Sequence, residues 1–180
     1  LQITPIQLIR AISASINGGR LVTPHVAKAL SDEKGNIVKE FEYGNGTQIL
    51  SKETSDTMRT ILESVVEIGT GNKAYIPGFR IGGKTGKYIA SFCAFAPAEK
   101  PQVITLVLID EPKGVYYGGQ VAGPVMKEIL ANSLPYLGIE PIYNENEQKM
   151  KGIGTFTVEN YVGQIKTGID KKQYKFTGCR

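Results

Sequence analysis

The stretch Gly78-Phe-Arg-Ile-Gly-Gly-Lys-Thr-Gly86 and the residues after it, Lys87-Tyr-Ile-Ala-Ser-Phe-Cys-Ala-Phe-Ala96, decide which fold this sequence predicts. Residues 78–85 satisfy the G-x-x-x-x-G-K-[ST] pattern of a phosphate-binding loop. Such a loop joins a buried strand to a helix, because the first N–H groups and the dipole of that helix meet the phosphate. Here Gly86 follows Thr85 directly, and residues 88–95 have the aromatic and β-branched content of a strand.

A second feature also speaks against a nucleotide site. The run Val103–Asp110 is apolar and ends in an acid, as a magnesium-binding strand would. Residues 86–102 alone separate it from Thr85, and they contain no helical pattern. The strand–helix–strand crossover that a nucleotide-binding fold requires cannot be built from them. We therefore interpret the phosphate-loop match as accidental.

The rest of the chain predicts helices around a small group of strands. Thr4, Pro5 and Gln7 form a capping-box start, and apolar residues at 58, 61, 62, 65 and 66 form the core-facing stripe of a second helix that ends near Gly69. Pro124 is tolerable in a third helix because we expect it in the first turn. The expected helices are 5–17, 52–68 and 120–134, and the expected strands are 79–86, 88–96 and 103–110, with short strands or turns between 21 and 43.

Composition indicates one main domain with a small appendage. The chain has 180 residues, is 41% hydrophobic and carries a net charge of +4. Its basic residues are scattered, which argues against nucleic acid and suits an anionic or carboxylate-bearing partner. Cys93 and Cys179 lie far apart and predict neither a disulfide framework nor a zinc finger. No apolar run approaches the roughly 20 residues that span a bilayer. The chain opens on Leu1 without Met, so we expect a fragment of a longer protein.

The triplet Lys84-Thr85-Gly86 has a chemical interpretation of its own if it lies on an exposed strand. The Lys84 ammonium can hold a carboxylate, and the Thr85 hydroxyl can donate a hydrogen bond to it. Gly86 lacks a Cβ, so an extended peptide can lie against the strand edge. The backbone N–H of Lys87 can then stabilise an oxyanion. These four residues are our candidate catalytic and substrate-binding positions.

With its neighbouring motifs, this triplet resembles the C-terminal part of the transpeptidase domain of class B penicillin-binding proteins. The resemblance covers residues 1–138, and its motifs occur in the family's order. They are Thr4-Pro-Ile-Gln-Leu8, Asn17-Gly-Gly19, Pro24-His25, Met58-Arg59, Val65-Val-Glu-Ile-Gly-Thr-Gly71, Gly82-Gly-Lys-Thr-Gly86, Ser91-Phe-Cys-Ala-Phe-Ala-Pro-Ala98, Ile109-Asp-Glu-Pro-Lys-Gly114, Tyr117-Gly-Gly119 and Ala122-Gly-Pro-Val125. Residues 139–154 are polar and predict a linker, and residues 155–180 are similar to the first part of a PASTA domain.

The resemblance implies an α/β (α+β) fold, an antiparallel sheet covered by helices, which is incomplete in this chain. It implies a peptidoglycan D,D-transpeptidase that acts through a serine acyl-enzyme, is acylated by β-lactams and needs no cofactor. The expected partners are stem peptides, the upstream part of the same protein and other cell-wall synthesis proteins. The expected place is the outer side of the cytoplasmic membrane. The tail favours a sporulation branch, with a division-type branch as the alternative.

Two departures from the family accompany these expectations. Its nucleophile motif S-x-x-K and its S-x-N motif are expected N-terminal to Leu1. The family also has a hydroxyl residue and a longer hairpin after the Lys-Thr-Gly triplet. Here Lys87-Tyr88 follows the triplet directly, so we expect that a loop is missing from this sequence after Gly86.

Rival interpretations and residues remain open at this stage. A serine β-lactamase would share the triplet, and a non-catalytic wall-binding module is a further alternative. We expect the single histidine, His25, and the neighbouring Asp110 and Glu111 to be structural. We expect Cys93 to be a buried inert thiol, with a metal-binding role as the alternative. For Tyr116 and Tyr117 two interpretations stay open: they line a substrate groove, or they pack in the core or in a turn.

Overall fold

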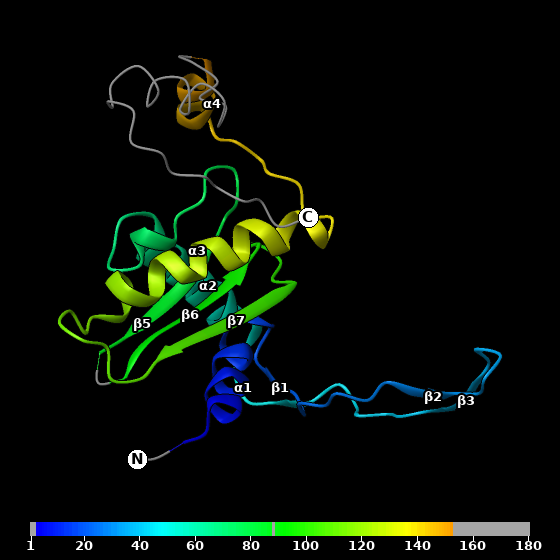
Figure 1. Ribbon diagram of the computed structural model, residues 1–180. Coiled ribbons are helices and arrows are strands. Elements are labelled where there is room, and N and C mark those ends of the chain that lie inside the picture. The colour runs from blue at the N-terminus through cyan, green and yellow to red at the C-terminus, as the bar shows by residue number, and fades with distance from the viewer. Residues whose placement is uncertain (1–2, 88, 153–180) are drawn as a thin grey trace, which may run out of the picture. The chain divides into compact units, whose positions relative to one another are not determined.

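A computed structural model describes residues 3–87 and 89–152 and shows a mixed α/β fold (Figure 1). The helices are α1 (Pro5–Ile16), α2 (Lys52–Glu67), α3 (Gly118–Tyr136) and α4 (Glu145–Gly152), with a short 3₁₀ helix η1 (Asn72–Ala74). The strands are β1 (Arg20–Leu21), β2 (Ala29–Ser31), β3 (Ile37–Glu40), β4 (Thr47–Gln48), β5 (Gly82–Gly86), β6 (Ala90–Ala96) and β7 (Val103–Ile109). The expected antiparallel sheet with covering helices is confirmed.

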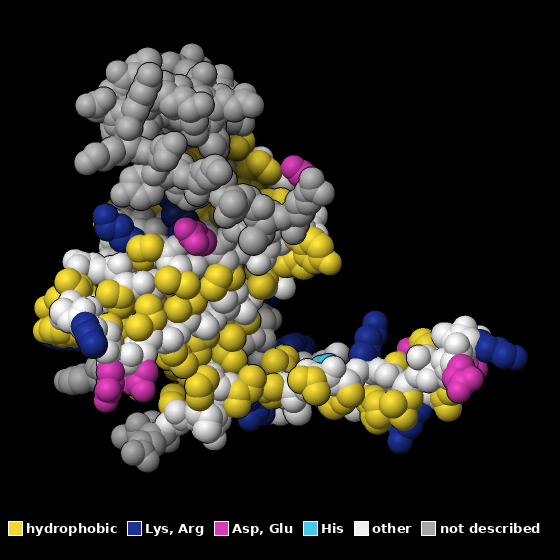
Figure 2. Space-filling view, in the orientation of Figure 1, with side chains coloured by type: hydrophobic (Ala, Val, Ile, Leu, Met, Phe, Trp, Pro, Cys, Tyr) yellow, Lys and Arg dark blue, Asp and Glu magenta, His cyan; other side chains and the backbone are white. Residues whose placement is uncertain are grey.

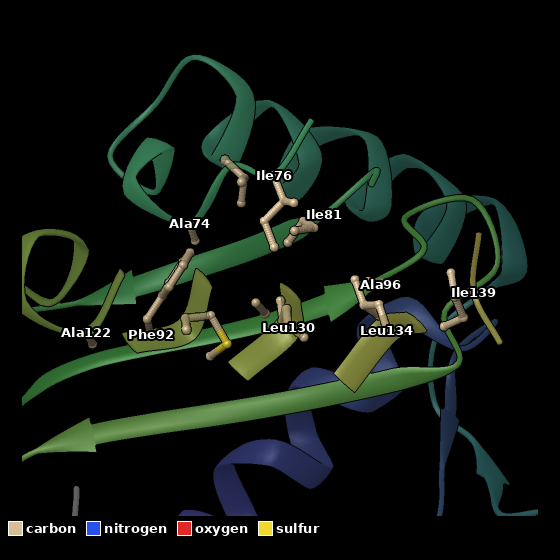
Figure 3. Close-up of a cluster of buried hydrophobic side chains, with 12 residues drawn as sticks. Ala74, Ile76, Ile81, Phe92, Ala96, Ala122, Leu130, Leu134 and Ile139 are labelled. Atoms are coloured by element: carbon tan, nitrogen blue, oxygen red, sulfur yellow. The ribbon is translucent and has the colours of Figure 1, made fainter. Parts of the chain in front are cut away.

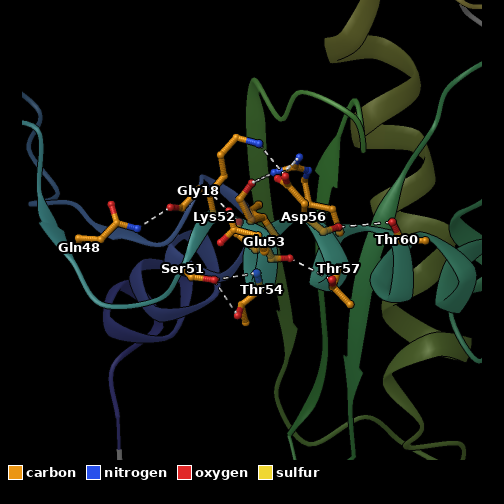
Figure 4. Close-up of polar contacts among 12 residues, drawn as sticks. Gly18, Gln48, Ser51, Lys52, Glu53, Thr54, Asp56, Thr57 and Thr60 are labelled. Atoms are coloured by element: carbon orange, nitrogen blue, oxygen red, sulfur yellow. Dashed lines mark hydrogen bonds and ion pairs between the residues drawn. The ribbon is translucent and has the colours of Figure 1, made fainter.

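The first two helices begin where the sequence predicts, because a side chain caps each one. The Gln7 N–H donates to Thr4 Oγ1 at 3.3 Å, and the Gln7 side chain accepts from the Thr4 N–H at 2.8 Å. At the start of α2, Ser51 Oγ accepts from the Thr54 N–H at 3.1 Å (Figure 4). These contacts satisfy N–H groups that have no partner inside the helix.

The main sheet has the order β5-β6-β7, and both pairings are antiparallel. In the first pairing, Lys84 lies opposite Cys93 and Gly86 lies opposite Ser91. Strand β5 ends at Gly86 and β6 begins at Ala90. The loop that we expect to be missing between them stays a prediction.

Helix α3 covers one face of the sheet and forms the larger hydrophobic core (Figure 3). From β6, Phe92 is fully buried and contacts the same cluster as Leu130 and Leu134 of α3, which are also fully buried. Ile76 and Ile81, from the segment that leads into β5, complete the cluster. Burial of such side chains stabilises the fold by roughly 1.5–3 kcal/mol each.

A second cluster on the other side of β6 joins α1 and α2 to the sheet. Ile16, Leu62 and Phe95 are buried together there, and Met58 packs against them. The apolar stripe predicted for α2 is therefore confirmed at Leu62 and Val66, which are buried, but not along its full width, since Ile61 is 53% exposed. A helix that packs on one side buries only the residues that point directly at the sheet.

Helix α3 differs from its predicted bounds. It begins at Gly118 rather than near residue 120, so Pro124 lies in the second turn and removes an internal hydrogen bond to the Gln120 carbonyl. The helix also continues through Pro135, which we expected to lie beyond its end. Gly118 explains the early start, because a Cβ at this position would lie 2.2 Å from the Ser91 carbonyl oxygen. Gly118 lies outside the predicted range 120–134, and in the structure it allows the first turn of the helix to approach the sheet.

Residues 20–48 form a two-stranded ribbon that extends from the sheet and helices of the same unit (Figures 1 and 2). Its base is the β1–β4 pair and its outer part is the β2–β3 pair. Within it, the His25 and Tyr43 rings stack with centroids 3.6 Å apart. His25 thus has a local packing partner in the ribbon, which agrees with a structural role.

The chain divides into a compact unit of residues 1–142 and a second unit that begins at Tyr143. In the predicted linker, residues 145–152 form α4. The PASTA-like interpretation falls on residues 155–180, which lie outside the described residues. Among the helices that the structure describes, none has the length and apolar character of a membrane span.

Candidate active site at the edge of the sheet

The triplet predicted from sequence lies on β5, whose pairing in the described part of the chain is with β6 alone. Lys84 is exposed, and Thr85 and Gly86 are partly exposed. The Lys84 ammonium donates a hydrogen bond to the Thr85 carbonyl oxygen, so the end of its side chain lies beside the next residue of the strand. The free edge can accept hydrogen bonds from an extended peptide, as the sequence interpretation requires.

A hollow of about 860 Å³ contains all the candidate binding positions from Lys84 to Lys87. Its lining residues come from the end of α2, η1, β5 and the start of α3. They are Ile68, Gly69, Thr70, Asn72, Lys73, Lys84, Thr85, Gly86, Lys87, Tyr117, Gly118, Gly119 and Gln120. Three of these are lysines and none is Asp or Glu, so the hollow favours an anionic ligand.

Thr70 supplies a contact that sequence reasoning did not assign. Its hydroxyl oxygen lies 3.1 Å from that of Thr85, so one hydroxyl donates to the other. The turn that presents Thr70 is held by a hydrogen bond from the Gly71 N–H to the Val65 carbonyl at 2.9 Å. Thr70 was part of a family motif in the sequence, but nothing in the pattern indicated that it meets Thr85.

The start of α3 forms another side of the hollow, and Gly119 allows its backbone to approach Thr70 and Thr85 closely. A Cβ on Gly119 would lie 2.1 Å from the Thr70 carbonyl oxygen and 3.2 Å from Thr85 Cγ2. Tyr117 precedes this turn, and its ring stacks on the ring of Tyr116 with centroids 4.7 Å apart. The Lys87 ammonium nitrogen lies 5.7 Å from the centroid of the Tyr117 ring. Tyr117 therefore both packs in a turn and lines the hollow, the two roles left open by the sequence.

Cys93 lies opposite Lys84 in the β5–β6 register, but its side chain is 3% exposed. Burial raises the pKa of the Cys93 thiol to about 12. The thiol is thus protonated near neutral pH, which makes it a poor nucleophile. In residues 3–87 and 89–152, no group of three His, Cys, Asp or Glu side chains is arranged to hold a metal ion.

Two serine patterns elsewhere in the chain do not contribute to this hollow. The segment Ser31-Asp-Glu-Lys34 matches the S-x-x-K pattern, although we expected the family's S-x-x-K motif N-terminal to Leu1. In the structure this segment lies at the turn that joins β2 to β3. Ser15-Ile-Asn17 matches S-x-N and lies at the end of α1, where the Asn17 side chain donates to the Arg20 carbonyl. Neither pattern contributes a lining residue.

A second hollow, of about 740 Å³, lies beside the start of α2. Here opposite charges already meet, since Asp56 receives hydrogen bonds from both Lys52 (Figure 4) and Arg59 at 2.6 Å. Hydrogen bonding, first by Lys52 and then by Arg59, lowers the pKa of the Asp56 carboxyl. This paired cluster stabilises the helix start, and we assign it no ligand.

The fold and the hollow together define a mixed α/β domain with a cation and a hydroxyl at the open edge of its sheet. Residues 1–131 match the family model of the penicillin binding protein transpeptidase domain, and the chain belongs to this family.

Named relatives agree with this assignment. Stage V sporulation protein D of Bacillus subtilis is 41% identical, and the match covers 94% of this chain and 29% of the relative. The probable peptidoglycan D,D-transpeptidase PenA of Neisseria gonorrhoeae is 38% identical, with 78% of this chain and 25% of the relative covered. The chain thus spans less than a third of the length of these relatives.

Among solved structures, the D,D-transpeptidase domain of a peptidoglycan glycosyltransferase from Eggerthella lenta superposes with a TM-score of 0.65. It is 27% identical, and the match covers 77% of this chain and 34% of that one. The fold class predicted from the sequence is therefore confirmed by known structures as well as by the model.

Proposed function

We propose that the protein containing this chain is a peptidoglycan D,D-transpeptidase and that Lys84, Thr85 and Gly86 bind the donor peptide. The observation that carries this proposal is the hollow beside β5, which brings Lys84 and the Thr70–Thr85 hydroxyl pair together without any acidic residue. In this assignment Lys84 and Thr85 hold the terminal carboxylate of a stem peptide that lies along β5.

The proposed reaction is acyl transfer. A serine outside residues 1–180 attacks the penultimate D-alanyl carbonyl, the peptide C–N bond breaks, and the terminal D-alanine leaves with a proton. An amine of a second stem peptide then attacks the ester, which releases the serine and forms the cross-link. The Lys87 N–H donates to the oxyanion in both steps. A β-lactam carboxylate takes the place of the peptide carboxylate, and its ring opens on the same serine.

The proposed setting is cell-wall synthesis at the outer side of the cytoplasmic membrane, together with other cell-wall enzymes. Similarity to stage V sporulation protein D supports a role in sporulation, and hence in the spore cortex. Similarity to the PenA transpeptidases makes a division role the alternative within the same chemistry. No cofactor is required for this reaction.

The test uses the full-length protein that contains residues 1–180 and a fluorescent penicillin. Covalent labelling is expected to persist for hours, whereas release within seconds would indicate a β-lactamase. Lys84→Ala is expected to lower the second-order labelling rate by about 10- to 100-fold, because a charge-assisted hydrogen bond contributes roughly 1.5–3 kcal/mol.

The matched control is Lys127→Ala on α3, an exposed lysine outside the hollow. It removes the same charge and is expected to label at the wild-type rate. Unchanged labelling of Lys84→Ala would contradict the role assigned to Lys84, and no labelling of the wild type would contradict the proposed function.

A further inference from the structure

We propose that Arg80 is a positioning residue for β5: through Glu63 it joins the segment that enters this strand to α2, and so it aligns Thr85 with Thr70 in the hollow. This proposal rests on the proposed function and adds to it a residue outside the hollow. Arg80 is not among the residues that line the hollow, so it acts through the two threonines rather than on a ligand.

The first support is the geometry of the contact between Arg80 and Glu63. The guanidinium donates from Nε to Glu63 Oε1 at 2.5 Å and from Nη2 to Glu63 Oε2 at 2.6 Å. Two parallel hydrogen bonds of this kind fix the orientation of both groups, which a single contact does not. A further nitrogen, Nη1, pairs with Glu99 in the segment between β6 and β7. Arg80 therefore joins three parts of the fold.

The second support is that the backbone is held on both sides of this contact. Glu63 lies in α2 one turn before Val66, which is buried in the larger hydrophobic core. Ile81, the neighbour of Arg80, is buried in the same core (Figure 3). The Arg80 carbonyl also accepts a hydrogen bond from the Ala98 N–H at 2.8 Å. A bidentate contact between two held backbones restricts how they lie relative to each other.

The third support is that the same two elements carry the hydroxyl pair of the hollow. Thr70 belongs to the turn after α2, Thr85 belongs to β5, and their hydroxyl oxygens lie 3.1 Å apart. The contact of Arg80 with Glu63 joins these elements at a second place. A hydrogen bond between two neutral hydroxyls is weaker than a charge-assisted pair. Loss of the Arg80–Glu63 contact should therefore disturb the alignment of the hydroxyls before it disturbs the strand.

The experiment measures the second-order rate at which a fluorescent penicillin labels the full-length protein. Arg80→Gln is expected to lower this rate about fivefold, as the loss of one positioned neutral hydrogen bond to the ligand implies. Arg80→Lys keeps the charge without the two parallel bonds and is expected to recover part of the rate. Glu63→Gln removes the charge from the other side of the same contact and is expected to match Arg80→Gln, so the test does not depend on one variant being folded.

A double variant distinguishes positioning from a general loss of structure. If Arg80 acts through the hydroxyl pair, its removal has little left to change once Thr70→Val has removed that pair. The combination of Arg80→Gln with Thr70→Val is then expected to label about fivefold more slowly than the wild type, as each single variant does. Independent effects would multiply to about 25-fold.

Arg59→Gln is the matched control. Arg59 also forms an ion pair on α2, with Asp56 at 2.6 Å, and it lies outside the hollow. The variant loses an arginine and an ion pair and is expected to label at the wild-type rate. Urea denaturation of every variant shows how much stability each change removes, so that the labelling rates are compared between folded proteins.

Three results overturn this proposal and leave the transpeptidase assignment intact. The first is wild-type labelling of both Arg80→Gln and Glu63→Gln. The second is a double variant whose rate falls by the product of the two single effects. The third is an equal fall in Arg59→Gln, which would mean that the loss of any ion pair of α2 slows labelling. Absence of labelling in the wild type overturns the proposed function, and this proposal with it.

Discussion

At the scale of single residues, the Thr70–Thr85 hydroxyl contact connects the triplet to the turn after α2. In the proposed function Thr85 presents its hydroxyl to a carboxylate, and a free threonine hydroxyl rotates among several orientations. The contact at 3.1 Å restricts that rotation. Thr70 is therefore a positioning residue for Thr85, and its removal should affect binding rather than folding.

Thr70→Val removes this hydroxyl with little change in shape. We expect the second-order rate of penicillin labelling of the full-length protein to fall about fivefold, as the loss of a hydrogen bond of roughly 1 kcal/mol implies. The control is Thr57→Val on the exposed side of α2, where the hydroxyl donates to the Glu53 carbonyl outside the hollow. Equal rates for both variants would show that Thr85 needs no positioning by Thr70.

Cys93 gives a prediction about pH. Its thiol has a folded-state pKa of about 12, raised from 9.0 by burial. Below about pH 9 the thiol is protonated in both states and contributes fully to stability. As pH rises from about 9 toward 12, only the unfolded thiol ionises, so this contribution is lost.

Cys93→Ala lacks this dependence, while the other titrating groups are common to both proteins. The free energy of unfolding of the wild type, from urea denaturation, should therefore fall relative to the variant by on the order of 1 kcal/mol between about pH 9 and 10. A constant difference across this range would mean that the Cys93 thiol ionises as readily in the fold as in the open chain.

Residue types and spacing were sufficient to predict that Lys84 and Thr85 lie on an exposed strand, because the aromatic and β-branched residues that follow them are local signals of a sheet. They were not sufficient for Thr70 or Lys73. Both reach the hollow through the turn after α2 and the packing of α3 at Gly119 and Gly123, which are tertiary contacts that leave no local periodicity.

At the scale of elements, α2 links the second core to the site, since Leu62 is buried in that core and the turn after the helix presents Thr70. Ser51 caps the first turn of this helix. Its bounds agree closely with the prediction, as the cap and the apolar spacing are local signals. Helix α3 was predicted less well at its start. Gly118 and Gly119 weaken a helix intrinsically, and here close packing on β5 and β6 outweighs that weakness.

Ser51→Ala removes the cap of α2 and should lower the free energy of unfolding by about 1 kcal/mol. Ser64→Ala is the matched control, because Ser64 lies inside the same helix with an exposed side chain that bonds to the Thr60 carbonyl. That change should be neutral or slightly stabilising, since alanine has the higher helix propensity. Urea denaturation measures both, and equal effects would show that the cap contributes nothing to α2.

At the scale of the compact unit of residues 1–142, stability is unevenly distributed. Strand β6 bonds to neighbours on both sides and its side chains enter two hydrophobic clusters, through Phe92 and Phe95. The β2–β3 ribbon has the opposite character, because its strands pair with each other and Ile37 and Val38 are 62% and 69% exposed (Figure 2). Segments with few buried apolar contacts open without global unfolding.

Hydrogen exchange followed by mass spectrometry on the full chain tests this distribution. Amides of β6 should exchange through global unfolding, whereas those of β2 and β3 should exchange through local opening at least about 100-fold faster. The penicillin-labelled full-length protein provides a second comparison: peptides from β5 and the turn at Thr70 should gain protection, and the ribbon should not. Equal protection of β6 and the ribbon would mean that the ribbon packs against another surface in solution.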